Sequence, residues 1–311
     1  MQELAKVEKG KLAEVVANVI ADKSDGTARK YTERLAHFAA WLRDYGQPLD
    51  KRAIGAYRRE LAVEGKAAST INGHLVAVRA LLREAAEMDL ISYEQAERMA
   101  SIKSVKQKGE RLGNWLSRED AQRLLDTPDG GTLKGTRDKA ILALLLFCGL
   151  RRSEITGLTM GHLQERDGHN VIADLLGKGG RVRTVKLPVP VKRAIDSWLE
   201  ASGRELPDHA PVFVAMRKGG KLAGTERLSD QAIYKMVREY AELIGKPELR
   251  PHDLRRTFAK LARTGDAPLE QISLTLGHAR LETTQRYLGT ELNLDSSAPD
   301  FVGLRVNGKK D

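Results

Sequence analysis

The chain has 311 residues, of which 41% are hydrophobic and 30% are charged, and its formal net charge at pH 7 is +10. These proportions are typical of a globular protein in water and exclude an intrinsically disordered or membrane-embedded chain. The length favours two domains over a single core. The excess of basic residues favours a polyanion such as nucleic acid as partner, although a well-solvated basic surface explains the charge equally well.

The cysteine and hydropathy patterns bear on where the protein works. Cys148 is the single cysteine, which excludes a disulfide framework. The longest apolar run, Ala140–Leu150, is too short to span a bilayer. The charged N-terminal segment lacks the apolar stretch of a secretory signal. We therefore expect a cytoplasmic protein without a membrane segment.

The N-terminal part of the chain has the pattern of a bundle of short helices. Apolar residues recur at helical spacing within Thr27–Tyr45, within Asp50–Val63 and over Ile71–Ala85. Ser69 or Thr70 is expected to cap the last of these helices. Each polar residue on the outer faces is typical of a solvated surface, but as a set they suit a DNA backbone: Arg29, Lys30, Arg34, Arg58, Arg59, Lys66, His74, Arg79 and Arg83.

A basic linker without apolar periodicity, residues 103–113, separates this bundle from a second domain. Ser117 is expected to cap the first helix of that domain. Asp138–Gly149 is nearly all apolar and predicts a buried helix. Asn170–Leu176 and Val182–Leu187 are rich in β-forming residues and flank a glycine-rich turn, which predicts an antiparallel hairpin.

The remaining predicted elements are one strand and three helices. Val212–Met216 is the candidate strand. Ser229 is expected to cap a helix that ends at Ile244 and turns four residues inward, namely Ile233, Met236, Val237 and Leu243. Two further helices are predicted over His252–Arg263 and Pro268–Leu276. The expected fold class is mainly α with a small antiparallel β-sheet.

Two basic residues in the second domain are candidates for chemistry. A glycine stop after the buried helix would present Arg151 from a rigid base. Glu154 would share its helix face and could fix the guanidinium by a charge-assisted bond. Taken alone, an arginine at such a junction is more often part of a surface ion pair. Lys178, in the glycine-rich turn, is either a solvated turn residue or an ammonium that protonates a departing alkoxide.

A second group of candidates lies near the C-terminus. His252 and Arg255 are spaced to project from one helix face, where they could converge on a phosphate. Taken alone, a histidine in a helix is more often a cap or a core residue. His278 follows a glycine stop and could cap the next helix. Tyr287 is either a core aromatic or an oxygen nucleophile.

Together these residues resemble the motifs of the tyrosine recombinase family, which comprises phage integrases and Xer-type enzymes. GLRRSEI, which contains Arg151, is similar to the first arginine box of the family. HDLRRTFA, with His252 and Arg255, is similar to the second box. LGHARLETTQRYLG, with His278 and Tyr287, is similar to the third.

The resemblance implies a role for each candidate. Arg151 and Arg255 would clamp the non-bridging oxygens of a scissile DNA phosphate. Tyr287 would attack phosphorus to give a 3′-phosphotyrosyl link, and Lys178 would protonate the leaving 5′-oxygen. Three residues would support them: His252 by assisting proton transfer, His278 by donating a hydrogen bond to the phosphate, and Glu154 by orienting the site.

The resemblance also implies a domain plan and partners. A SAM-like helical core-binding domain would cover residues 1–102, and the linker would cover residues 103–113. A catalytic domain would follow over residues 114–290. Residues 291–311 would form a tail that could exchange between subunits. The partners would be double-stranded DNA with specific recombination sites, three further copies of the chain in a homo-tetramer on DNA, and accessory proteins of unknown identity. No metal, ATP or other cofactor is implied, and the expected location is the cytoplasm, at the nucleoid.

The expected activity is site-specific recombination or integration through a Holliday junction. A type IB topoisomerase, which uses similar residues on one duplex, is an alternative. So is a DNA-binding accessory protein without catalysis, although the intact set of residues argues against it. Arg152 and Arg256 duplicate the boxed arginines, and the family pattern with the helix register favours Arg151 and Arg255.

Overall fold

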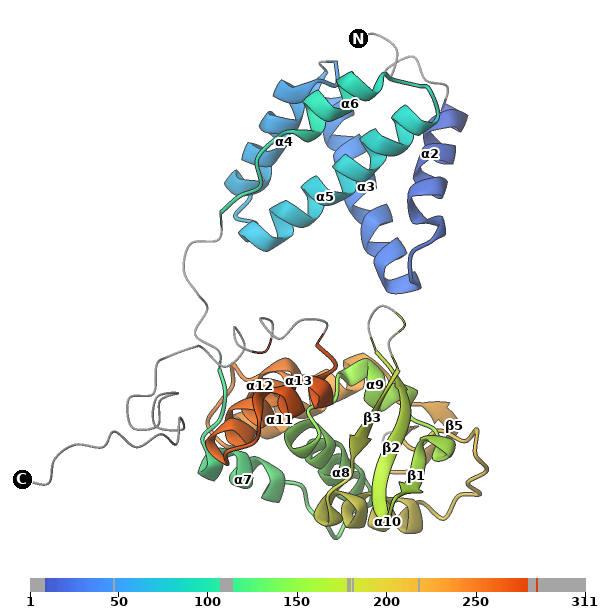
Figure 1. Cartoon of the computed structure of the whole chain (residues 1–311), viewed down its shortest axis with the longest axis vertical. Coiled ribbons are helices and arrows are strands. Elements are labelled where there is room, and N and C mark those ends of the chain that lie inside the picture. Colours follow the sequence, from blue (N-terminus) through green and yellow to red (C-terminus); the bar gives the residue numbers. More distant parts are fainter. Residues whose placement is uncertain are drawn as a thin grey trace, which may run out of the picture. The chain divides into compact units, whose positions relative to one another are not determined.

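The computed structural model describes residues 9–46, 48–106, 114–177, 180, 182–217, 219–278 and 284 (Figure 1). Internal contacts divide the chain into two compact units, Met1–Arg111 and Leu112–Asp311, and each is described by itself. Lys178, Tyr287 and the tail over 291–311 lie outside the described residues. Among the residues that are described, no helix is long and apolar enough to cross a membrane.

The elements described in the first unit are helices, as the apolar spacing predicts. They are α2 (Lys9–Ala21), α3 (Asp25–Tyr45), α4 (Lys51–Val63), α5 (Ala68–Glu87) and α6 (Tyr93–Ala100). The Asp50 side chain caps α4 by accepting the backbone N–H of Ala53 at 2.7 Å. The predicted caps Ser69 and Thr70 are wrong, because α5 already begins at Ala68 and both residues lie in its first turn.

A polar cluster extends from the surface of the first unit into its core. His74 is 8% exposed, so its predicted place on a polar face is wrong. Its Nδ1 lies 2.7 Å from the hydroxyl of Tyr57, which lies 2.9 Å from Nδ1 of His37. Burial, followed by the charges of His37 and Arg34, lowers the pKa of His74 to about 4. The imidazole enters the core because the tyrosine supplies a hydrogen-bond partner that an apolar pattern does not reveal.

The first residues of the predicted linker are attached to this bundle. Nε of Arg79 donates to the Ala100 carbonyl at 3.0 Å, and Nη1 of Arg58 donates to the Lys103 carbonyl at 2.8 Å. The Asn72 amide accepts the backbone N–H of Val105 at 2.7 Å and donates to its carbonyl at 2.9 Å. These contacts hold the chain through Val105 against α4 and α5. Arg58 and Arg79 therefore use some of their N–H donors to bind protein backbone.

The second unit contains more helices and two small sheets. The helices are α7 (Arg118–Asp126), α8 (Leu133–Phe147), α9 (Arg152–Gly157), α10 (Val189–Ser202), α11 (Asp230–Leu243), α12 (Pro251–Thr264) and α13 (Leu269–Leu276), with a 3-10 turn η1 (Met160–His162). The Ser117 and Ser229 hydroxyls cap α7 and α11 as predicted, each at 3.1 Å. Leu243 is wrongly predicted as inward: it is 71% exposed, because the buried stripe of α11 continues through Tyr240, Ala241 and Ile244.

The larger sheet has the order β1 (Leu163–Arg166), β2 (His169–Leu176) and β3 (Val182–Lys186), all antiparallel. The predicted β2–β3 pair is confirmed. The candidate strand near Val212 forms as β4 (Val214–Met216), which pairs with an unpredicted strand, β5 (Leu222–Arg227). The fold class is thus mainly α, as predicted, with two small antiparallel sheets among the residues that the structure describes.

Helix α8 lies at the centre of the second unit and packs against α10 and α12. It is buried along almost its whole length, which fixes where its C-terminal end lies. The carboxylate of Asp138 is fully buried on α8 and pairs with Arg137 at 2.7 Å and with Lys134 at 2.9 Å. Figure 1 shows α9, α12 and α13 along one edge of this unit, and the described candidate residues lie on these helices or next to their ends.

Candidate active site

The turn between α8 and α9 fixes the position of Arg151. Gly149 takes a φ of 58°, which a side chain would strain, and a Cβ there would lie 2.6 Å from the ring of Phe258 on α12. The turn therefore lies directly against α12. Leu150 is buried, and Arg151 occupies the N-cap position of α9. Glycine here permits both the turn and the close approach of the two helices.

Glu154 holds Arg151 in place at the start of α9. One carboxylate oxygen accepts the backbone N–H of Arg151 at 2.7 Å, and the other accepts Nη1 of its guanidinium at 2.7 Å. The predicted charge-assisted bond is thus present. Burial raises the pKa of Glu154, but hydrogen bonds from Arg183 and Arg151 outweigh it, so that the pKa lies below its usual value. The carboxylate is ionised at neutral pH.

The same carboxylate binds Arg183 of β3, a residue that the sequence did not single out. Its Nη1 and Nη2 donate to the two oxygens of Glu154 at 2.9 Å each, and its Nε donates to the Thr275 carbonyl at 2.9 Å. The sequence does contain one indication that Arg183 points inward. Side chains alternate between the two faces along β3, so Arg183 lies on the same side as the buried Val185. That signal places the side chain inward but does not reveal its partner.

Helix α12 carries His252 and Arg255. Pro251 occupies its first turn, and the side chain of Asp253 accepts the backbone N–H of Arg250 at 3.0 Å. Arg255 is 1% exposed, and its guanidinium donates to the carbonyls of Gly149 and Leu276. His252 stays solvent-accessible in the first turn of the helix.

The end of α13 presents His278. Gly277 takes a φ of 62°, and a Cβ there would lie 2.9 Å from Cδ of Arg183. The backbone N–H of His278 donates to the Ser273 carbonyl at 3.1 Å, which completes the helix end. Nδ1 of His278 lies 2.8 Å from the hydroxyl of Thr284. The predicted glycine stop is therefore present, and it lets the end of α13 lie against Arg183.

Burial and the charges of nearby arginines both lower the pKa values of the two imidazoles. The pKa of His278 is lowered to about 4 by burial, and then by the charges of Arg255 and Arg151. The pKa of His252 is also lowered to about 4, by desolvation from the surrounding protein atoms and then by Arg256, Arg255 and Arg151. Two imidazoles on different elements thus sense the same guanidinium charges. Such a site is suited to an anion, which would relieve the repulsion between its cations.

The neighbouring arginines have other partners. Arg152 lies over the ring of Tyr234, 5.6 Å from its centroid, and donates to the Asp230 carbonyl at 3.3 Å. Arg256 lies 3.9 Å from the Asp253 carboxylate. By contrast, Arg151 is bonded to Glu154, and Arg255 is buried. Arg152 and Arg256 thus have different surroundings, and the choice of Arg151 and Arg255 as the boxed arginines stays a prediction.

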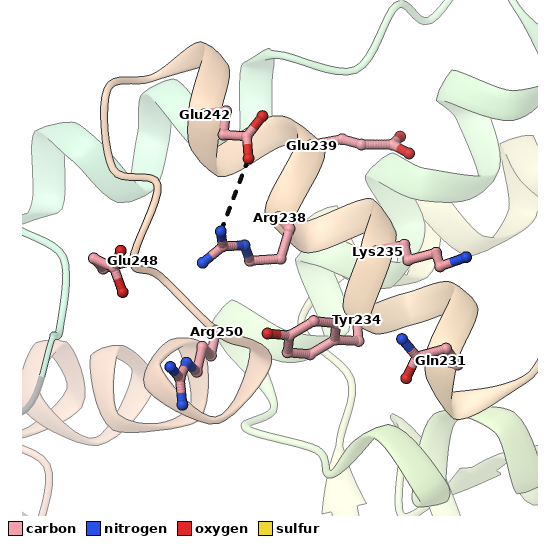
Figure 2. Close-up of a pocket in the computed structure, with 8 residues that line it drawn as sticks. All are labelled: Gln231, Tyr234, Lys235, Arg238, Glu239, Glu242, Glu248 and Arg250. Carbon is pink, nitrogen blue, oxygen red and sulfur yellow. Dashed lines mark ion pairs between the residues drawn. The ribbon is translucent and has the colours of Figure 1, made fainter.

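A separate pocket lies along α11 (Figure 2). Figure 2 shows side chains of both charges around it, with Arg238 and Glu242 paired at 3.9 Å. Its lining residues are Gln231, Tyr234, Lys235, Arg238, Glu239, Glu242, Glu248 and Arg250. None of the described candidate residues belongs to this lining.

Metal ligands do not gather in the described part of the chain. Within it, no group of three or more histidines, cysteines, aspartates or glutamates is placed to hold a metal ion. Burial raises the pKa of Cys148 to about 12, so it remains a neutral thiol inside the core. Of the predicted site residues, the second unit brings together Arg151, Glu154, Arg255, His252 and His278, whereas Lys178 and Tyr287 fall outside the described residues.

Both units match known protein families. The model of the phage integrase family matches residues 114–292, and that of the phage integrase N-terminal SAM-like domain matches residues 19–88. The tyrosine recombinase XerC of Corynebacterium efficiens is 32% identical, over 86% of this chain and 82% of that protein. The tyrosine recombinase XerD of Shewanella oneidensis is 33% identical, over 85% of this chain and 86% of that protein.

Solved structures agree on the fold. The Tn1549 transposon integrase in complex with circular intermediate DNA superposes with a TM-score of 0.69 at 17% identity, covering 91% of this chain and 96% of that one. A lambda integrase dimer bound to a COC′ core site superposes with a TM-score of 0.67 at 16% identity, covering 91% and 97%. The first unit carries the SAM-like domain and the second the catalytic domain. The chain belongs to the phage integrase family of tyrosine recombinases.

Proposed function

We propose that this chain is a site-specific recombinase, which cleaves and rejoins duplex DNA through a 3′-phosphotyrosyl intermediate and a Holliday junction. The observation that carries the proposal is the arrangement around Arg255, whose bonds to the Gly149 and Leu276 carbonyls bring together the turn before Arg151 and the helix end before His278. Burial, and then the charges of Arg255 and Arg151, lower the pKa of His278 to about 4. A cluster of positive charge of this kind suits a phosphodiester. Family membership, and relatives named tyrosine recombinases, supply the reaction class.

The chemistry exchanges one phosphodiester for another. The Tyr287 hydroxyl attacks phosphorus, forming a P–O bond to the tyrosine and breaking the bond to the 5′-oxygen. Lys178 gives its proton to that departing oxygen, and His252 assists removal of the proton from the tyrosine. In the reverse step a 5′-hydroxyl of the partner duplex attacks the phosphotyrosine, which releases the enzyme and exchanges the strand.

Fixed positive charge stabilises the transition state. Arg151 and Arg255 balance the charge on the non-bridging oxygens, and His278 donates a hydrogen bond to one of them. Glu154 keeps Arg151 from moving as that charge develops. Because the bonds broken and formed are of the same kind, the exchange needs no ATP. Because guanidinium groups supply the charge, we propose that it also needs no metal ion.

The assembly follows from the reaction. Two duplexes must each be cut on both strands, so we propose that four copies of the chain act on double-stranded DNA with specific sites. The predicted tail over 291–311 would then link neighbouring subunits in a cyclic tetramer. The proposed place of action is the bacterial nucleoid.

The decisive experiment traps the covalent intermediate. Duplexes with a randomised centre and a nick on one strand lose the short 5′-hydroxyl fragment after cleavage, so the adduct accumulates. We expect wild-type protein to form adducts that survive detergent, with and without EDTA, and to select a defined sequence. Tyr287→Phe should bind the selected duplex without forming an adduct, whereas the matched control Tyr234→Phe should form it.

Three outcomes would redirect the proposal. An adduct that persists in Tyr287→Phe contradicts the assignment of the nucleophile. Cleavage abolished by EDTA contradicts the metal-free mechanism. Relaxation of a supercoiled plasmid that lacks the selected sequence would instead support a type IB topoisomerase.

A further inference from the structure

Arg183 connects three elements of the catalytic unit. It lies on β3, in the hairpin that carries the predicted Lys178, and its side chain is 10% exposed. Its guanidinium binds Glu154 on α9 through two hydrogen bonds of 2.9 Å and the Thr275 carbonyl near the end of α13 through a third of 2.9 Å. This residue thus ties together the elements that present Arg151 and His278.

The hydrogen-bonding capacity of Glu154 is fully used. One oxygen accepts Nη1 of Arg151 at 2.7 Å and Nη1 of Arg183 at 2.9 Å. The other accepts the backbone N–H of Arg151 at 2.7 Å and Nη2 of Arg183 at 2.9 Å. A carboxylate offers about four lone-pair sites, so these four bonds saturate it. Its orientation is therefore fixed from two sides.

The charge balance makes Arg183 important for Arg151. The Glu154 side chain is 3% exposed, so its negative charge needs a partner inside the protein. With Arg183 present, one positive charge neutralises Glu154 and that of Arg151 remains for a phosphate. Without Arg183, Glu154 would draw on Arg151 alone, and the positive charge that faces a phosphate would fall.

We propose that Arg183 is a positioning residue for strand cleavage, which neutralises Glu154 so that the charge of Arg151 serves the scissile phosphate. The inference rests on the proposed function. The planar guanidinium is required because it engages both carboxylate oxygens while its Nε holds the Thr275 carbonyl. A lysine keeps the charge but has no such fork.

The test uses two versions of the DNA duplex selected by wild-type protein. One carries an ordinary phosphodiester at the cleaved position, and the other a methylphosphonate, in which a methyl group replaces one non-bridging oxygen and removes the negative charge. We expect Arg183→Met to cleave the phosphodiester about 100-fold more slowly than wild type in a single turnover, as for loss of a transition-state donor. On the methylphosphonate the difference should shrink to within about threefold, because no anion has to be held. Arg183→Lys should show the same pattern with a smaller loss.

Controls separate this role from a structural one. Arg166→Met removes an exposed arginine of the same sheet, which pairs with Asp174 at 3.2 Å, and should leave both rates unchanged. All variants should bind the duplex as tightly as wild type. An equal loss on both substrates would mean that Arg183 only supports the fold and would overturn the inference. If wild-type protein cleaves neither substrate, the proposed function is overturned instead.

A second variant tests the charge argument directly. In Arg183→Met the carboxylate of Glu154 is neutralised by Arg151 alone, and this is the cause of the defect. Adding Glu154→Gln should therefore restore the phosphodiester rate by about tenfold, within the range of couplings measured between contacting residues. The double variant should therefore be faster than Arg183→Met alone. Losses that simply multiply would show that the two residues act independently and would contradict the inference.

Discussion

The guanidinium of Arg255 donates a hydrogen bond to the carbonyl of Gly149, which lies 106 residues earlier in the chain. It also donates to the Leu276 carbonyl, and its side chain is among the largest that are fully buried. One arginine thus joins the turn that presents Arg151 to the helix end that presents His278. We infer that Arg255 holds the site together as well as giving it charge.

Substitution of Arg255 should therefore lower stability as well as activity. Arg255→Lys leaves at least one buried carbonyl without its donor, and we expect the free energy of unfolding in urea to fall by about 1–3 kcal/mol. The matched control is Arg256→Lys on the same helix, where the arginine is 28% exposed and 3.9 Å from Asp253. Its unfolding midpoint should stay close to wild type. Equal midpoints for the two variants would contradict a structural role for Arg255.

The sequence predicts the local part of this architecture well. The caps at Ser117 and Ser229 and the pairing of Glu154 with Arg151 depend on residues three positions apart, so they can be predicted without knowing the fold. The exposed strand β5 was missed, because most of its residues are exposed and it therefore lacks an apolar alternation. Its hydrogen bonds to β4 hold it in place.

The long-range part of the site could not be predicted in the same way. Arg183 and Glu154 are separated by 29 residues and lie on a strand and a helix, so no local spacing joins them. His74 was misplaced for a similar reason, because its partner Tyr57 lies on another helix. In both cases the partner allows a polar side chain to be buried, and only the tertiary structure identifies that partner.

The depressed histidine pKa values predict a loss of stability in acid. The pKa of His278 is about 4 in the folded chain against an ordinary 6.5. Between pH 6.5 and 4 the unfolded chain therefore binds more protons at this residue than the folded chain does. As a result, the free energy of unfolding has its full value above pH 6.5 and falls as the pH drops towards 4. Comparing urea unfolding at about pH 7.5 and about pH 5, we expect His278→Gln to lose on the order of 1 kcal/mol less than wild type, allowing for partial solvent exposure.

The control for this experiment is His169→Gln, an exposed histidine on β2. Its stability should change with pH as that of wild type does. If His278→Gln and wild type lose the same stability on acidification, the folded protein tolerates the charged imidazole, and burial and the neighbouring arginines disfavour that charge less than the structure indicates.

The core cysteine should be unreactive in the native protein. Cys148 is fully buried at the end of α8, and burial raises its pKa to about 12, so almost no thiolate forms near neutral pH. We expect iodoacetamide to modify it only after unfolding in urea. In Val63→Cys, a position that is 82% exposed, the introduced thiol should react at once. Equally fast labelling of Cys148 in wild-type protein would show that the end of α8 opens readily.

The last prediction concerns the attachment of the linker to the first unit. The Asn72 side chain makes two hydrogen bonds to the backbone of Val105, at 2.7 and 2.9 Å. Asn72→Ala removes both, so we expect the Val105 amide to exchange its hydrogen about 10-fold faster or more, which corresponds to loss of bonds worth about 1 kcal/mol each. Arg83→Ala, an exposed position on the same helix, should leave that rate unchanged. Unchanged exchange in Asn72→Ala would mean that the other contacts of α4 and α5 hold this segment without Asn72.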